Sequence, residues 1–323
     1  MEIRTDLALE AREMIDEKRS GSMKRNHALP EGMQVNSRET EYMTITNIDI
    51  TSEAAEKTIG KKRGKYITIE LKNPELNTIE VQEGVSKVLA DEIHQFIAAL
   101  GKKEPEIMIA GLGNWHITAD SLGPKVIDKI VVTRHVKNME NVEIDGRLGS
   151  VCAVSPGVMG ITGIETSEII RGMISTVRPD ILFVIDALAS RKASRVNTTI
   201  QISDTGIIPG SGVGNHRMEL SKEVLGIPVI AIGVPTVVDA MTLVRDILEK
   251  AGIRESDDIL KEAEAKGTEE MVVTPKNIDI AIERMAAVIS NGMNLATHKG
   301  FEIEEINDCL LYTSDAADDL TRV

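Results

Sequence analysis

The stretch Ile181-Leu-Phe-Val-Ile185 is continuously apolar and is followed at once by Asp186. A short apolar run of this kind is typical of a strand that is buried on both faces of a sheet. Similar runs elsewhere in the chain also predict strands: Ile107-Met-Ile-Ala110, Thr198-Thr-Ile-Gln-Ile202 and Val229-Ile-Ala-Ile232. The core of the protein is therefore expected to be a sheet with both faces covered.

Segments with apolar residues at helical spacing lie between and beside these strands. They predict helices over 85–100, 121–133, 164–176, 236–250 and 277–292. Buried strands that alternate with helices indicate an α/β fold, with a mostly parallel sheet and helices on both of its faces. Residues 43–48 and 66–71 instead alternate apolar and polar side chains, which predicts a smaller antiparallel strand element.

The same patterns predict the domain organisation. Residues 7–308 are expected to form a single α/β domain, with a β-rich extension over 40–75 and a charged surface linker over 255–270. Residues 309–323 are interpreted as a non-native tail, because Cys309 to Asp319 resembles the translation of a sequencing adapter. This tail is left out of the functional interpretation.

Composition excludes several classes of function. A net charge of −14 and a pI of about 5.0 argue against nucleic-acid binding, which needs clustered Lys and Arg. The chain has no apolar run long enough for a membrane span and no signal-peptide pattern. Its 2 cysteines cannot form a disulfide framework. We expect a cytoplasmic protein that needs no cofactor.

Two aspartates stand where chemistry is expected in such a sheet, beyond the carboxyl ends of its strands. Asp186 directly follows strand 181–185, and Asp120 ends the loop Gly111-Leu-Gly-Asn-Trp-His-Ile-Thr-Ala-Asp120 after strand 107–110. Two neighbouring carboxyl groups can share a water, one as base and the other as proton donor. Either aspartate could instead cap the helix predicted after it.

A glycine-rich loop, Thr205-Gly-Ile-Ile-Pro-Gly-Ser-Gly-Val-Gly-Asn215, follows strand 198–202. It lacks the spacing of a dinucleotide-binding or P-loop motif, so Gly210, Gly212 and Gly214 are expected to let a substrate approach the backbone. A phosphate-binding role remains an alternative. His116, His135 and His216 are candidate metal ligands, although no close ligand pair such as HExxH occurs.

Several long motifs resemble one family, the spore germination proteases. They are Gly111 to Pro124, Val132-Thr-Arg-His135, Ser155 to Thr166, Ile185-Asp-Ala-Leu-Ala189, Arg195 to Gly206, Pro209 to Asn215, Ile230 to Ala240 and Met271-Val-Val-Thr-Pro275. The resemblance runs from about Ile3 to Lys299. It implies an atypical aspartic-type endopeptidase that degrades small acid-soluble spore proteins during germination, in the spore core. It also implies a homotetramer that is made as a zymogen.

The resemblance assigns roles to particular residues. The two aspartates implicated in the family fall on Asp120 and Asp186, and family substrates are cut after an acidic residue in Thr-Glu-(Ile/Phe)-Ala-like sites. Thr5-Asp6-Leu7-Ala8 imitates such a site, which predicts self-cleavage between Asp6 and Leu7 and a propeptide over 1–6. The alternative is that this segment only starts a helix.

Two alternatives remain open at this point. The motif Gly111-Leu-Gly-Asn…Asp120 also resembles hydrogenase maturation endopeptidases, and on that interpretation Asp120 and Asp186 would hold a metal, with His216 as the candidate third ligand. A regulatory protein that binds phosphate through Gly212 and Gly214 is the non-enzymatic alternative.

Overall fold

The computed structural model describes residues 5–20, 29–72, 78–137, 139, 145–210, 217–251, 271–306 and 308. The linker at 255–270 and the tail at 309–323 lie outside these residues, as do Gly212, Gly214 and His216. None of the helices that the structure describes is long and apolar enough to cross a membrane.

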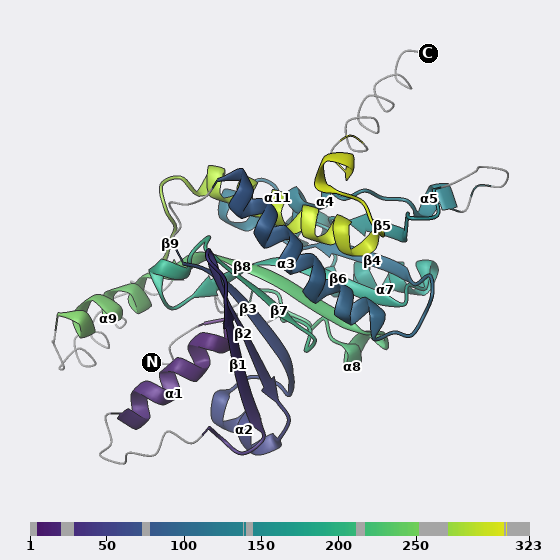
Figure 1. Ribbon diagram of the computed structural model, residues 1–323. Helices are drawn as coiled ribbons and strands as arrows, with labels where there is room; N and C mark the ends of the chain where they lie inside the picture. The colour runs from purple at the N-terminus through teal and green to yellow at the C-terminus, as the bar shows by residue number, and fades with distance from the viewer. Residues whose placement is uncertain are drawn as a thin grey trace.

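One sheet of 9 strands runs through the described chain in the order β1-β2-β3-β7-β8-β6-β4-β5, with β9 paired to β8 (Figure 1). The strands are β1 Met33–Glu39, β2 Met43–Ile50, β3 Gly64–Leu71, β4 Glu106–Gly111, β5 Ser150–Val154, β6 Ile181–Ser190, β7 Thr199–Ser203, β8 Val229–Asp239 and β9 Val272–Val273. The helices are α1 Ala8–Ser20, α2 Glu53–Ile59, α3 Ile79–Ala98, η2 Thr118–Asp120, α4 Leu122–Ile127, α5 Arg134–Lys137, α6 Met159–Thr162, α7 Thr166–Val177, η3 Ala193–Arg195, α8 Lys222–Leu225, α9 Ala240–Lys250 and α11 Ile278–Thr297.

The α/β fold class is confirmed, and the sheet has a parallel and an antiparallel part. β5, β4, β6 and β8 are parallel to their neighbours in this group, whereas β1, β2, β3 and β7 pair antiparallel. Strand 198–202, which its apolar pattern groups with the buried strands of the predicted mostly parallel sheet, instead pairs antiparallel with both neighbours. Only residues 191–198 connect β6 to β7, and a parallel return needs a crossover of a dozen or more residues.

Side chains alternate between the two faces along each strand, so both faces of the sheet carry apolar side chains. Helices cover both faces. Ile181, Phe183 and Ile185 of β6 belong to the main core, which packs under α3, α4 and α11. The side-by-side course of α3 and α11 over this face is visible in Figure 1. Leu182 and Val184 point to the opposite face, where they pack with Ile170 of α7.

The second face is covered by different helices at its two ends. At the parallel end it lies under α7 and α8, and at the antiparallel end α1 and α2 pack on β1, β2 and β3 through Leu9, Ala55 and Ile48. Asp186 has the same parity along β6 as Leu182 and Val184, so its side chain is on this second face.

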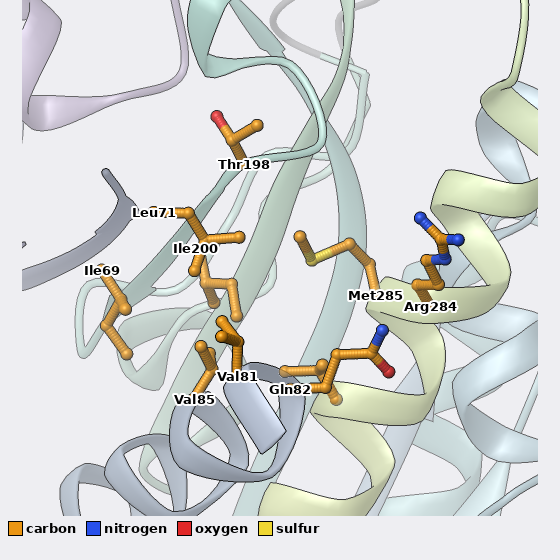
Figure 2. Close-up of a pocket in the computed structure, with 10 residues that line it drawn as sticks. Ile69, Leu71, Val81, Gln82, Val85, Thr198, Ile200, Arg284 and Met285 are labelled. Atoms are coloured by element: carbon orange, nitrogen blue, oxygen red, sulfur yellow. The ribbon is translucent and has the colours of Figure 1, made fainter. Parts of the chain in front are cut away.

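A small apolar hollow of about 10 Å³ lies on the main-core face, between β3, β7, α3 and α11 (Figure 2). Side chains such as Ile69, Val85, Ile200 and Met285 line it. It is too small and too apolar for chemistry, so we interpret it as a packing void of the core.

Candidate active site

The loop between β4 and α4 is built from glycines that allow two backbone segments to touch. A Cβ atom on Gly113, whose φ is +114°, would lie 2.0 Å from the carbonyl oxygen of Asp120. A Cβ on Gly111 would lie 2.2 Å from the carbonyl oxygen of Gly123, and one on Gly123 equally close to that of Leu112. Only glycine fits at these contacts, and the resulting fold of the loop fixes the position of Asp120.

Hydrogen bonds tie this loop to the middle of β6. The Leu112 amide donates to the carbonyl of Ile185 at 2.7 Å, and the Asn114 amide donates to the carbonyl of Asp120 at 2.9 Å. Asp120 ends the short helix η2, and the N-cap of α4 is Ser121. The alternative that Asp120 caps the following helix is therefore wrong.

Asp186 lies within a strand and not after one. β6 continues to Ser190, because residues 186–190 pair with β8 from Gly233 to Val238. The expected strand end at 185 and the alternative of a helix cap at Asp186 are both wrong. The side chain is only 5% exposed, and one carboxyl oxygen accepts a hydrogen bond from the Ala187 amide at 2.9 Å.

Burial and mutual repulsion perturb both carboxyl groups. Burial raises the pKa of Asp186 well above its usual range, and the charge of Asp120 raises it further. Burial also raises the pKa of Asp120, against the lowering effects of a backbone hydrogen bond at Asn114 and the charge of Arg217. The two carboxyl groups are close enough to influence each other, and Asp186 holds its proton more tightly.

Both aspartates line one cavity of about 210 Å³. Its walls come from the β4–α4 loop, the segment before α7, the end of β6, the loop after β7, and β8. The lining residues are Asp6, Leu112, Gly113, Ile117, Ala119, Asp120, Gly157, Val158, Thr166, Asp186, Ala187, Leu188, Ala189, Ile207, Ile208, Pro209, Gly210, Arg217, Thr236, Val237 and Val272. Apolar walls with a few carboxyl groups and one arginine suit a peptide substrate.

The N-terminal segment of the same chain enters this cavity. The Asp6 amide donates to the carbonyl of Ala189 at 3.0 Å, and the Ala189 amide donates to the Asp6 carboxylate at 2.9 Å. Leu7 and Ala8 are fully buried where α1 begins. Asp6 is close enough to Asp186 for its charge to contribute to the raised pKa of that group. The segment that imitates a substrate thus lies beside the aspartate pair.

The other candidate residues do not gather around the aspartate pair as a group. Gly210 lines the cavity and has a φ of +73°, whereas Gly212, Gly214 and His216 lie outside the described residues. His116 and His135 are exposed. Within the described ranges, no group of three or more His, Cys, Asp or Glu side chains has the arrangement of a metal site.

Three residues of the site were missed by the sequence predictions. Arg217 comes after the glycine-rich loop and lines the cavity, and Lys61 and Gln201 contact the N-terminal segment. No motif marks Lys61 or Arg217. Gln201 lies inside the motif Arg195 to Gly206, but the resemblance assigns it no role.

Comparison with known proteins identifies the family. A family model described as germination protease matches residues 8–254. The chain belongs to the germination protease family. It is 44% identical to the germination protease of Clostridium acetobutylicum over 94% of this chain and 98% of the relative. It is equally identical to that of Caldanaerobacter subterraneus, over 95% and 98%.

Membership of this family confirms that the protein is a peptidase, as the resemblance implied. A solved structure, the NiFe hydrogenase maturation protease HycI from Thermococcus kodakarensis, matches 61% of this chain and 98% of its own, with 18% identity and a TM-score of 0.30. A likeness at this TM-score is too low to support any statement about the site.

Proposed function

We propose that this germination protease is an endopeptidase that cuts after acidic residues and uses Asp120 and Asp186 to activate water. The observation that carries the proposal is the shared cavity, in which both carboxyl groups lie beside Asp6 of the chain's own substrate-like segment. The stronger rise in the pKa of Asp186 supports a division of labour, with Asp120 ionised and Asp186 protonated.

The proposed reaction has two steps. Asp120 takes a proton from a water molecule, whose oxygen bonds to the carbonyl carbon of the acidic residue while the carbonyl π electrons move to its oxygen. The intermediate then collapses, the C–N bond breaks, and the leaving nitrogen takes the proton of Asp186. Asp120 ends protonated and Asp186 ionised, so one proton must return to Asp186 before the next turnover.

The proposal extends to the biology of the family. The substrates are small acid-soluble spore proteins in the cytoplasm of the spore core, and the chain is made as a zymogen that cleaves its own Asp6–Leu7 bond. The position of Asp6 at the cavity wall, followed by the buried Leu7 and Ala8, supports self-processing, because an acidic residue already lies at the proposed site of cleavage. Exposed apolar residues in and just after α6, Met159, Ile161 and Ile164, support contact with another chain, such as a subunit of a homotetramer.

The test is cleavage of a peptide that contains Thr-Glu-Ile-Ala by chains prepared without residues 1–6, so that the comparison of variants does not depend on self-cleavage. Asp120→Asn and Asp186→Asn should each slow cleavage by roughly 10²–10⁴-fold with folding intact. Asp204→Asn is the matched control, because its carboxylate accepts from the Lys65 amide and does not line the cavity.

Two outcomes would contradict the proposal. Retained activity in either cavity variant would remove that aspartate from the mechanism. Loss of cleavage on addition of a strong chelator, with recovery on adding metal, would replace the bare aspartate pair by a metal site.

A further inference from the structure

The carbonyl oxygen of Asp6 accepts hydrogen bonds from two side chains that are distant in sequence. Lys61 Nζ donates to it at 3.0 Å, and Gln201 Nε2 donates at 3.2 Å. This is the carbonyl of the bond that self-cleavage would break. The other amide atom of Gln201, Oε1, accepts from the Ala8 amide at 2.7 Å, so Gln201 binds the backbone on both sides of the Asp6–Leu7 bond.

Lys61 differs from the basic residues that come after it in the chain. Lys62 and Arg63 point outward and pair with Glu219 and Glu56. Lys61 is half-buried, and its ammonium group donates to the carbonyls of Thr5 and Asp6, both at 3.0 Å. Burial lowers the pKa of Lys61, and the nearby charges of Asp6 and Glu10 partly oppose this shift. The backbone carbonyls that this cation binds therefore fix its position.

The sheet register places Gln201 on the same row as Asp186. Gly233 of β8 pairs with Asp186 on one side and with Gln201 on the other, so all three residues face the same side of the sheet. Adjacent strands are about 4.8 Å apart, which sets the Cα atoms of Asp186 and Gln201 about 10 Å apart across Gly233. The Asp6 segment lies on this face, where it is hydrogen-bonded to Ala189 of β6 and to Gln201 of β7.

We infer that Lys61 and Gln201 form the site that binds the carbonyl oxygen of the residue before the cleaved bond and stabilises the negative charge that develops on it. The inference rests on the proposed function. Two donors about 3 Å from one carbonyl oxygen have the geometry that such sites require, and a positive charge on one of them strengthens the stabilisation.

Self-cleavage of the full chain tests the inference, with the first-order loss of residues 1–6 followed by mass spectrometry. Lys61→Ala and Gln201→Glu should each slow the reaction by roughly 10²–10³-fold. Gln201→Glu keeps the acceptor for the Ala8 amide, replaces the donor by an oxygen and adds a negative charge. Lys62→Ala, which removes the exposed neighbouring cation, should cleave at the wild-type rate.

Chemical rescue separates hydrogen-bond donation from a structural role. Added propylammonium should restore cleavage to Lys61→Ala, because it supplies an N–H donor with a positive charge. Tetramethylammonium carries the charge without an N–H group and should not restore it. Lys61→Arg should keep most of the activity, because its guanidinium group also supplies charged N–H donors.

The possible results are distinguishable. Wild-type rates in both Lys61→Ala and Gln201→Glu would overturn the inference and leave the aspartate mechanism standing. Slow cleavage that neither Lys61→Arg nor propylammonium restores would show that Lys61 has only a structural role, which also overturns the inference. If the wild-type chain is never cut after Asp6 and does not cleave the Thr-Glu-Ile-Ala peptide either, the proposed function itself is wrong.

Discussion

The carboxyl group of Asp186 is buried among strand residues, where it accepts a hydrogen bond from the Ala187 amide. Burial penalises its charged form, so removing the charge should stabilise the fold. The folded-state pKa is raised, so the unfolded chain loses its proton first, at a pH of about 3.9, and stability falls as the pH rises from there toward the folded-state pKa.

Asp186→Asn should escape this loss of stability. We expect it to be more stable than the wild type by about 1 kcal/mol near pH 7 and similar to it below about pH 3.9, as measured by urea unfolding at both pH values. Asp145→Asn is the control, because Arg147 lowers the pKa of that exposed carboxylate and its removal gives no gain. A variant that is less stable than wild type at both pH values would contradict the argument.

The glycines of the β4–α4 loop should resist substitution. Gly113→Ala places a Cβ 2.0 Å from the Asp120 carbonyl oxygen in a backbone conformation of positive φ, so we expect a loss of more than about 1 kcal/mol in unfolding free energy and a slower cleavage rate. Gly172→Ala in the middle of α7 meets no neighbouring atom and should instead stabilise by roughly 0.5–1 kcal/mol. Thermal unfolding of both variants checks the contrast.

Sequence patterns predicted which two aspartates lie at the site, but not the structure of the segments around them. Asp120 and Asp186 were predicted as a pair from their positions after apolar runs, and the structure brings both to one cavity. The pattern could not show that Asp186 lies inside a strand, because the run 186–190 is stabilised by pairing with β8 and not by local propensity. Lys61 and Gln201 could not be predicted, since only the tertiary fold brings them to Asp6.

At the scale of elements, α1 is attached to the sheet by a network of ions. Arg195 of η3 contacts Glu10, Glu13 and Glu70 at 3.4, 2.7 and 2.7 Å, and Glu10 is fully buried. Burial raises the pKa of Glu13, but hydrogen bonds from Arg195 and Lys192 outweigh it and lower that pKa to about 2. The network joins the helix after the proposed cleavage site to strand β3 and to the segment that leaves β6.

Loss of Arg195 should be costly. Arg195→Met leaves Glu10 buried without this cation, and we expect a loss of about 3–5 kcal/mol in unfolding free energy, measured by urea unfolding. Self-cleavage should also slow, because α1 positions Asp6. Arg63→Met removes an exposed ion pair with Glu56 and should cost under about 1 kcal/mol. Equal losses of unfolding free energy in the two variants would show that burial of the Arg195 network adds nothing to stability.

Helices with a strong apolar periodicity were predicted well. Strands and helix ends that depend on pairing with distant strands were predicted poorly. The helix predicted over 85–100 is the C-terminal part of α3, and that over 277–292 largely coincides with α11. The helix predicted over 121–133 ends as α4 at Ile127, and residues 236–239 of another predicted helix belong to β8. β1 was missed because this exposed edge strand has a weak apolar pattern, and the short apolar run Val151-Cys-Ala-Val154 of β5 was missed as well.

At the scale of the whole molecule, the N-terminal segment lies at the cavity of its own chain. Self-cleavage should therefore be intramolecular. We expect its first-order rate constant to stay unchanged across a wide dilution series of the wild-type chain. The control mixes uncut Asp186→Asn chain with processed wild-type enzyme, and the variant should remain intact at Asp6–Leu7 because its segment is bound in its own cavity. A rate that rises with concentration would instead indicate cleavage between chains.

The burial of Leu7 makes the proposed cut hard to reverse. Hydrolysis of the Asp6–Leu7 bond would turn the Leu7 amide into an amino group, which is protonated at neutral pH, at a position that is 0% exposed and at the N-terminus of α1. A buried cation costs several kcal/mol, and the positive end of a helix adds repulsion. The new N-terminus at Leu7 would therefore leave its buried position for water. The two chain ends would separate after hydrolysis, which makes the cleavage irreversible.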